Sequence, residues 1–326
     1  MMTSIRRQLV ALVERGAIPS EQVATAVRLS GLYPSGHAWY VFVDRLLLWL
    51  GSLALAFGVL FLIAWNWAGM GRLPRFGLVE AALVLAIAVY WVAGGRGVVA
   101  RVALTAAVLL VGVLLALVGQ VYHSGADPWQ LFSTWALLVL PWVLVARFDV
   151  LWVLWLGLLD LAVLRFFHEF GPSAGIWWIG DVPAQWGLLL LNGLALALWE
   201  LAARRWQWLS ARWPRCLLAL GSGGPITLLV MLFIIDEGAA SWWSPVVYLL
   251  WLVGLYATYR YWRPDLFMLA GGCLSLMLVV TLFVARLLWN DADADAGGLL
   301  ILALLVLAQG AATVFWLKRL HREMTS

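Results

Sequence analysis

The chain has 326 residues, of which 64% are hydrophobic and only 12% are charged. A soluble globular protein is about 45–50% apolar and roughly 25% charged, so this chain has too few charged side chains to cover a water-facing surface. These proportions exclude a soluble enzyme or binding domain and indicate an integral membrane protein. The net charge of +4 fits the arginines that orient membrane proteins, and we expect the lipid bilayer, not nucleic acid, as partner.

The first 45 residues are polar enough to lie outside the membrane, and they predict a short helical hairpin. Apolar side chains recur at helical spacing from Ile5 to Val13. Gly16 ends this run, and Ser20 is placed to cap a second helix. We therefore predict a cytoplasmic N-terminal helical hairpin over residues 1–45. It either covers the membrane domain or docks a cytoplasmic partner; DNA binding is disfavoured, because its second helix has few basic residues.

From residue 46 onward the chain is a series of long apolar runs. A bilayer core about 30 Å thick requires roughly 20 helical residues, and continuously apolar runs favour helices over the alternating pattern of a β-barrel. We predict an all-α, polytopic transmembrane helix bundle over residues 46–326. Its ten spans are 46–67, 76–93, 102–119, 131–146, 149–167, 185–201, 216–235, 245–260, 266–288 and 298–317. A very tight turn joins spans four and five, which could instead form a re-entrant hairpin; we prefer two spans.

The distribution of positive charge predicts the orientation of these spans. With the N-terminus in the cytoplasm, 17 of the 21 arginines and lysines fall on the cytoplasmic side, as the positive-inside rule requires. The four exceptions are Arg72, Arg75, Arg165 and Arg286. We expect a multi-pass protein of the bacterial inner (cytoplasmic) membrane, with the N- and C-termini cytoplasmic.

Polar side chains inside the spans are costly and are candidates for function by default. Glu80, Asp160 and Asn192 all fall in the outer half of the predicted membrane. This distribution predicts a polar pocket that opens to the outside, with Glu80 or Asp160 at its floor. Its candidate residues are Asn66, Glu80, Gln120, Tyr122, His123, Asp160, Arg165 and His168. Alternatively, the carboxylates pair with arginines and only fix the packing of the helices.

The most distinctive stretch is residues 119–130, GQVYHSGADPWQ, which joins spans three and four on the predicted outer side. Asp127 is placed to cap span four, with Pro128 as the first helical residue. We therefore interpret Asp127 and Pro128 as a structural cap. Gln120, Tyr122 and His123 have no comparable structural role, which is why they are assigned to the pocket.

Residues 119–132, GQVYHSGADPWQLF, resemble the signature of an uncharacterised family of bacterial membrane proteins, domain of unknown function 2157. The resemblance extends to residues 12–23 (LVERGAIPSEQV) and 63–67 (IAWNW), and so covers roughly the first 150 residues. The family brings no established activity. The resemblance implies that the protein occurs beside other small membrane proteins, which points to a complex. It also implies that seven residues form one group at the outer face: Asn66, Trp67, Gln120, Tyr122, His123, Asp127 and Trp129.

No catalytic or metal-binding motif is complete in this sequence. Residues 168–172 begin like HExxH but have Pro172 in place of the second histidine, and the acidic residues 291–295 are not followed by the glycine and glutamate of an EF-hand. We expect no cofactor and no metal, and the sequence leans against an enzyme.

Three functions remain open at this point. The first is a subunit or scaffold of a membrane complex, whose outer face docks a membrane or periplasmic protein. The second is a secondary transporter or small-ligand binder that uses the outer pocket. The third, which the sequence favours least, is a membrane enzyme acting on lipid or envelope substrates.

Overall fold

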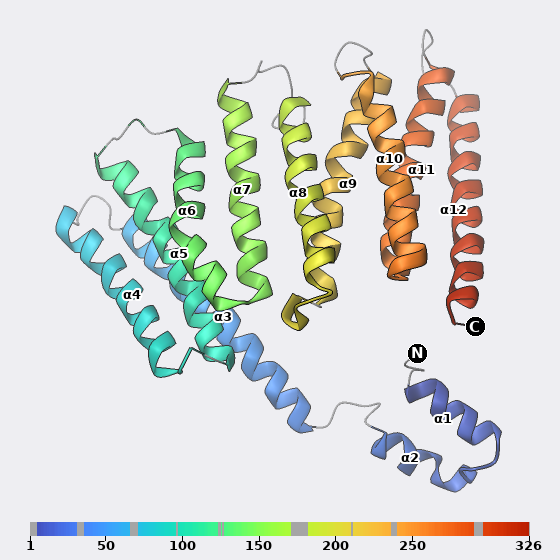
Figure 1. Ribbon diagram of the computed structural model, residues 1–326, viewed down its shortest axis with the longest axis horizontal. Coiled ribbons are helices and arrows are strands. Elements are labelled where there is room, and N and C mark those ends of the chain that lie inside the picture. Colours follow the sequence, from blue (N-terminus) through green and yellow to red (C-terminus); the bar gives the residue numbers. More distant parts are fainter. Residues whose placement is uncertain are drawn as a thin grey trace. The chain divides into compact units, whose positions relative to one another are not determined.

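The computed structural model describes the chain except residues 1–4, 31–35, 66–70, 96, 123–124, 126, 171–181, 210, 236–239, 290–295 and 326. Within the described residues every regular element is helical (Figure 1). The prediction of an all-α polytopic bundle is therefore confirmed. The chain divides into two compact units, residues 1–114 and residues 115–326, and each is described by itself below.

The first unit begins with the predicted helical hairpin. Its helices are α1 (Ile5–Glu14), α2 (Val23–Leu29), α3 (Gly36–Trp65), α4 (Arg72–Val92) and the first part of α5 (Gly97–Tyr122). Ser20 does not cap α2; it is the first residue of a 3-10 turn, Ser20–Gln22, that leads into it. Because α3 already begins at Gly36, the predicted boundary at residue 46 lies inside a continuous helix. Hydropathy marks where a helix becomes apolar, not where it begins.

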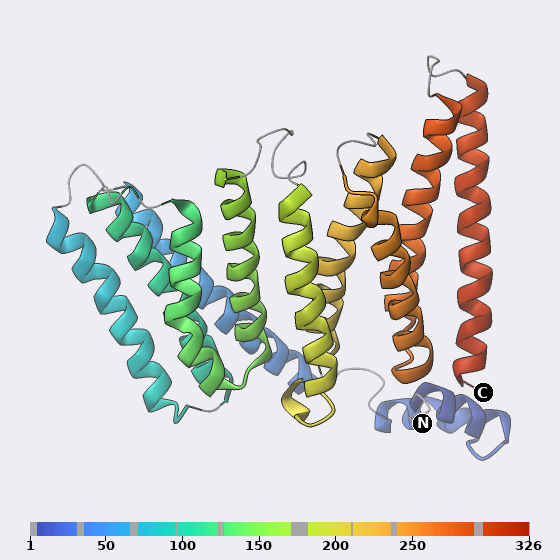
Figure 2. The ribbon, with the colours of Figure 1, turned by 45° about the horizontal axis from the view of Figure 1, so that its top comes forward.

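The second unit consists of antiparallel helices in which chain neighbours pack side by side (Figure 2). After the end of α5 these are α6 (Pro128–Ala146), α7 (Asp149–Phe170), α8 (Val182–Ala202), α9 (Arg212–Ile235), α10 (Trp243–Ala257), the π-helical η4 (Thr258–Trp262), α11 (Leu266–Leu288) and α12 (Ala296–Thr325). The tight turn between α6 and α7 is made by Arg147, which has a left-handed φ of 45°. Both α6 and α7 are long and apolar enough to cross a membrane, which favours two spans over a re-entrant hairpin.

Nine of the described helices are long and apolar enough to cross a membrane: α3 to α9, α11 and α12. The remaining expected span, 245–260, falls on α10, which has only 15 residues but continues without a break into η4. At the end of this run the Tyr259 hydroxyl donates to the Glu200 carboxylate near the end of α8, 3.2 Å away. Arg260 pairs at 2.7 Å with Glu323 near the end of α12. Residues 243–262 therefore run back to the end of the unit where α8 and α12 end, as a tenth crossing requires.

Glycines allow the helices of the second unit to approach closely. A Cβ atom at Gly221 on α9 would lie 2.6 Å from the Asn192 Oδ1 atom on α8, and one at Gly223 would lie 2.7 Å from the Trp251 ring on α10. Such small residues are how helices associate in a membrane, where the hydrophobic effect does not drive them together. An apolar cluster that includes Leu189, Ile226 and Tyr248 joins the same three helices.

Candidate functional site

The motif of residues 119–132 lies at the end of α5 and the start of α6. Asp127 is the extended residue before α6 and Pro128 is the first helical residue. The backbone N–H of Gln130 donates to the Asp127 carbonyl oxygen at 3.0 Å. The Asp127 carboxylate does not bond a backbone N–H at the start of the helix; it accepts the Trp129 indole N–H at 3.3 Å. The sequence pattern thus placed the start of the helix, while the carboxylate holds a neighbouring side chain.

Aromatic side chains hold the start of α6 against the end of α7. The Trp129 ring meets the Phe166 ring edge-on at 5.3 Å, and its centroid lies 6.3 Å from that of Phe170. Such perpendicular pairs stabilise a contact by about 0.5–1.5 kcal/mol beyond the area they bury. Because Phe166 follows Arg165 directly, this packing also fixes the turn of α7 that carries Arg165.

A cavity of about 930 Å³ opens between these helix ends. Its polar lining comes from Gln120 on α5, Gln130 and Thr134 on α6, and Arg165 on α7. We call it the motif cavity. Two amides, one hydroxyl and one guanidinium offer mostly N–H and O–H donors, and its described lining contains no carboxylate. The arrangement suits a ligand rich in acceptor oxygens.

The structure brings only part of the predicted constellation to the motif cavity. Gln120 and Arg165 both line it, whereas Tyr122 and His168 do not. Tyr122 is 63% exposed at the end of α5, and His168 is exposed on the last turn of α7. Asn66 and His123 lie outside the described residues. The distance of His123 from the carboxylates therefore stays a prediction.

Asp160 does not line the motif cavity; it contacts α8 instead. The Asn192 side-chain amide donates to the Asp160 carboxylate at 2.7 Å and to the Leu188 carbonyl oxygen at 3.1 Å. Asn192 is 4% exposed and packs on the bare backbone of Gly221. The partner of this intramembrane carboxylate is thus an amide on the next helix, not the arginine that the packing alternative assumed.

Glu80 has the opposite surroundings. It lies on α4 in the first unit, is exposed, and makes no hydrogen bond or ion pair among the described residues. Its place relative to the motif cavity stays a prediction, because Glu80 and the cavity belong to different units.

Sequence reasoning missed a charged cluster at the other end of the second unit. The Glu200 carboxylate on α8 lies 3.5 Å from Arg215 on α9 and 3.1 Å from Arg263 just after η4. It also accepts the hydroxyl of Tyr259, which is 2% exposed. The available signal was a lone glutamate at the end of a span whose following 15 residues contain four arginines. This signal is weak, because a charge at the edge of a span is not costly.

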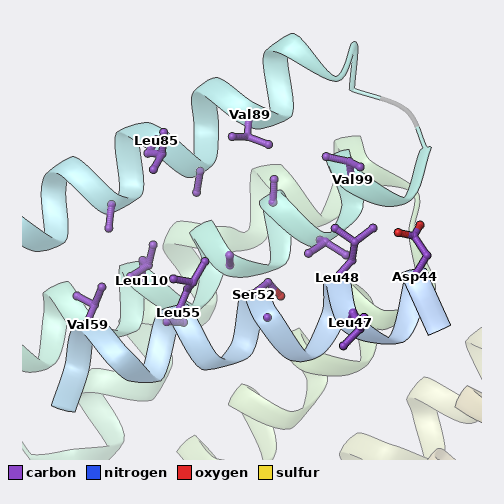
Figure 3. A pocket seen from close by; sticks show the side chains of 17 residues that line it. Asp44, Leu47, Leu48, Ser52, Leu55, Val59, Leu85, Val89, Val99 and Leu110 are labelled. Carbon is purple, nitrogen blue, oxygen red and sulfur yellow. The ribbon is translucent and has the colours of Figure 1, made fainter. Parts of the chain in front are cut away.

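The first unit contains a cavity of a different kind, about 620 Å³ in volume, between α3, α4 and α5 (Figure 3). Apart from Asp44 and Ser52, its lining residues are apolar or glycine, and the Ser52 hydroxyl donates to the Trp49 carbonyl oxygen on its own helix. Figure 3 shows Asp44 at one end of the groove. Such a lining offers almost nothing to a hydrophilic ligand.

Metal-binding groups do not gather in the part of the chain that the structure describes. No group of three or more histidine, cysteine, aspartate or glutamate side chains there could hold a metal ion. Cys216 and Cys273 are free thiols in α9 and α11.

Comparisons with known proteins agree with this picture of a membrane protein without an assigned activity. No curated protein and no solved structure matches the chain. The resemblance seen in the sequence is confirmed, because residues 11–152, which include the motif and its flanking helices, match the family described as Predicted membrane protein (DUF2157).

Proposed function

We propose that this membrane protein binds an anionic or oxygen-rich solute at the motif cavity. The observation that supports the proposal is that Gln120 and Arg165, which lie on helices α5 and α7, line one open cavity together with Gln130. Arginine binds carboxylate and phosphate groups through two parallel hydrogen bonds, and amides add directional donors.

The position of Arg165 supports the same conclusion. It is one of only four basic residues that the predicted topology puts on the outer side, where the positive-inside rule disfavours them. Among the described residues it forms no ion pair, and no carboxylate lines the cavity beside it. An arginine that neither orients the protein nor neutralises a lining carboxylate is available to a ligand.

Binding is a better match to this geometry than transport. A transport path would have to continue from the cavity toward the middle of the membrane, where Asp160 lies on α7. Asp160 is not among the lining residues, and its carboxylate is bonded to Asn192. We therefore assign the motif cavity to recognition of a solute at the membrane surface.

The test is a thermal-shift titration of the full chain, purified in detergent, with citrate, inorganic phosphate and glycerol 3-phosphate. At least one of these anions should raise the melting temperature of the parent protein. Arg165→Gln should weaken this effect about tenfold or more, since a charge-assisted hydrogen bond contributes about 1.5–3 kcal/mol. The control is Arg72→Gln, which removes an exposed arginine that does not line the cavity. Equal weakening by both substitutions, or no response to any of the anions, would refute the proposal.

A second function, as a subunit of a membrane complex, is favoured by Glu80. A charged carboxylate at the centre of a membrane helix costs about 2.5–3.5 kcal/mol on the translocon scale, and Glu80 is exposed without a described partner. A polar side chain of another membrane protein would remove this cost. Capture from native membranes after cross-linking should recover a membrane or periplasmic partner with the parent protein and lose it with Glu80→Leu; equal recovery would exclude Glu80 as the contact.

We also propose that both termini lie in the cytoplasm and that the protein belongs to the bacterial inner membrane. Support comes from the 17 basic residues on the predicted inner side. The same end of the second unit that gathers Arg212, Arg215, Arg260 and Arg263 also holds the end of α12, through the Arg260–Glu323 ion pair.

A further inference from the structure

A second cavity, of about 410 Å³, lies between α8, α9 and η4 at the arginine-rich end of the second unit. One part of its lining is apolar and includes Leu196, Ala197 and Leu255. The other part is charged and aromatic, and includes Glu200, Arg204 and Trp262. We call this the inner cavity. Its two-part lining is the first indication of an amphiphilic ligand.

The charges around the inner cavity do not cancel. Glu200 is the acidic group of the cluster, and it is shared by Arg215 at 3.5 Å and Arg263 at 3.1 Å. Arg204 adds a further positive charge and forms no ion pair among the described residues. Two guanidinium groups, those of Arg204 and Arg263, and one carboxylate line the cavity, which leaves its lining with a net positive charge.

The positive groups are held in place before any ligand arrives. The Arg204 guanidinium lies over the Trp262 ring, 5.0 Å from its centroid, a cation–π contact that fixes its plane. Arg263 is held by Glu200, whose side chain is 13% exposed, and Tyr259 donates to the same carboxylate. Preorganised arginines lose less conformational entropy on binding than free ones.

The π-helical turn contributes to this arrangement. It follows α10 directly and ends at Trp262, so it forms the last turn of that helix. Here the turn and the residue after it bring Thr258, Tyr259, Trp262 and Arg263 to the lining of one cavity. The wider turn thus places an aromatic ring and a guanidinium on the same side of the chain.

We infer that the inner cavity binds the phosphate headgroup of an anionic phospholipid, with part of an acyl chain along its apolar wall. Basic pockets between transmembrane helices on the cytoplasmic side are suited to anionic lipid headgroups, and Arg guanidinium groups match phosphate oxygens bidentately. The apolar wall between α8 and α10 distinguishes this ligand from free phosphate, which would gain nothing from it.

Two glycines provide a way to fill the cavity without disturbing the charges. Gly193 and Gly254 both line it, and a Cβ atom added at either would meet nothing within 4 Å. A leucine at Gly254 would therefore occupy the apolar part of the cavity and exclude an acyl chain. We expect the variant to fold, because nothing lies within 4 Å of the new Cβ atom.

The experiment is a thermal-shift titration of the full chain in detergent with phosphatidylglycerol, phosphatidylcholine, glycerol 3-phosphate and inorganic phosphate. Phosphatidylglycerol should raise the melting temperature saturably and phosphatidylcholine should not; any response to glycerol 3-phosphate or inorganic phosphate should be unchanged by Arg204→Gln, because it belongs to the motif cavity. Arg204→Gln should weaken the effect of phosphatidylglycerol about fivefold, the change expected for one arginine near an anionic surface, and Gly254→Leu should abolish it. The matched controls are Arg205→Gln, an exposed neighbour that does not line the cavity, and Gly224→Leu, whose added Cβ is also unopposed.

Each outcome decides the inference. Equal weakening by Arg204→Gln and Arg205→Gln would show general attraction to a basic surface and overturn it. A response to glycerol 3-phosphate or inorganic phosphate that Arg204→Gln weakens as much as the response to phosphatidylglycerol would assign the cavity to a free phosphate and overturn the inference. No response to phosphatidylglycerol, or full retention of the response in Gly254→Leu, would also refute it. The motif cavity and Arg165 lie at the other end of α7 and α8, so either proposal can fail without the other.

Discussion

Two carboxylates within the membrane helices, Asp160 in the second unit and Glu80 in the first, have opposite surroundings. Asp160 accepts a hydrogen bond from Asn192 on the next helix, and in the same unit Ser275 bonds both Thr227 and Tyr248. In the first unit Glu80 is exposed and has no described partner. Burial varies from helix to helix within each unit: 50% of the apolar stretch of α5 and 44% of that of α9 are buried, against 6% for α4 and for α12.

The difference indicates how each unit meets the membrane. A chain that satisfies its own polar groups needs only lipid around it. A carboxylate that is exposed on a membrane helix either contacts a partner or faces lipid at a cost in free energy. Asp160 and Ser275 thus make their polar contacts within the second unit, whereas Glu80 makes none with the described residues.

The largest expected effect is in cysteine labelling, where a position either labels from one side of the membrane or does not. The experiment tests whether α10 crosses the membrane, which would make the number of crossings between positions 205 and 322 even. In a background without Cys216 and Cys273, cysteines at positions 127 and 205 should label from opposite sides of sealed membranes. Cysteines at positions 205 and 322 should label from the same side, because the Arg260–Glu323 ion pair holds the ends of η4 and α12 together. Labelling of 205 and 322 from opposite sides would mean that residues 243–262 do not cross.

A steric substitution should separate the close contact of α8 with α9 from the open surroundings of Gly77 on α4. Gly221→Leu would drive a side chain into Asn192, which is buried and hydrogen-bonded. The expected loss in the free energy of unfolding is about 1–3 kcal/mol or more, seen as a lower melting temperature in detergent. Gly77→Leu on α4 should have almost no effect, since its added Cβ meets nothing within 4 Å. Comparable losses at both sites would contradict the contrast in packing.

Removing polar groups should have opposite consequences in the two units. Asn192→Leu takes away the hydrogen-bond donor of Asp160 and should cost about 1–2 kcal/mol of stability. Glu80→Leu removes a carboxylate without a described partner and should leave the stability of the purified chain unchanged or raise it. Melting temperatures of the two variants in one detergent provide the comparison. A loss at Glu80 as large as that at Asn192 would show that Glu80 is bonded within the chain after all.

The smallest expected effect is at the hydroxyl cluster of α9, α10 and α11. Tyr248→Phe removes the hydroxyl that lies 2.9 Å from the Ser275 hydroxyl. Interhelical hydrogen bonds in membranes contribute about 0.6 kcal/mol on average, so the melting temperature should fall only slightly. The control Tyr256→Phe alters a partly exposed tyrosine on the same helix. A larger fall for the control would argue against the hydroxyl cluster as a stabilising contact.

The candidate site was only partly predictable from the sequence. The motif placed the start of α6 at Pro128, because an aspartate followed by proline is a local signal that a helix begins. It did not show that Gln130 and Thr134 line the cavity with Arg165, nor that Tyr122 is exposed and does not line it. The rotation of a helix about its axis decides such questions, and packing against neighbouring helices sets that rotation.

The Glu200 cluster shows more clearly what the sequence could predict and what it could not. The sequence contains an isolated glutamate followed by arginines, but its partners Arg215 and Arg263 are 15 and 63 residues further along the chain. Only the return of α9 and η4 to the same end of the bundle brings these charges together. These charges pair only if the number of membrane crossings between them returns the chain to the same end of the bundle. One short span that fails to cross would change that number.

The sequence by itself determined the membrane setting, the helical class and the approximate spans, because these depend on hydropathy summed over about 20 residues. It also identified the motif, since local turn chemistry is encoded in adjacent residues. The tertiary structure alone decided which polar groups are paired: Asp160 with Asn192, Glu200 with two arginines, and Glu80 with none of the described residues. The physical reason is that pairing in a membrane depends on which helix faces meet, and those faces are chosen by close contacts such as that of Gly221 with Asn192.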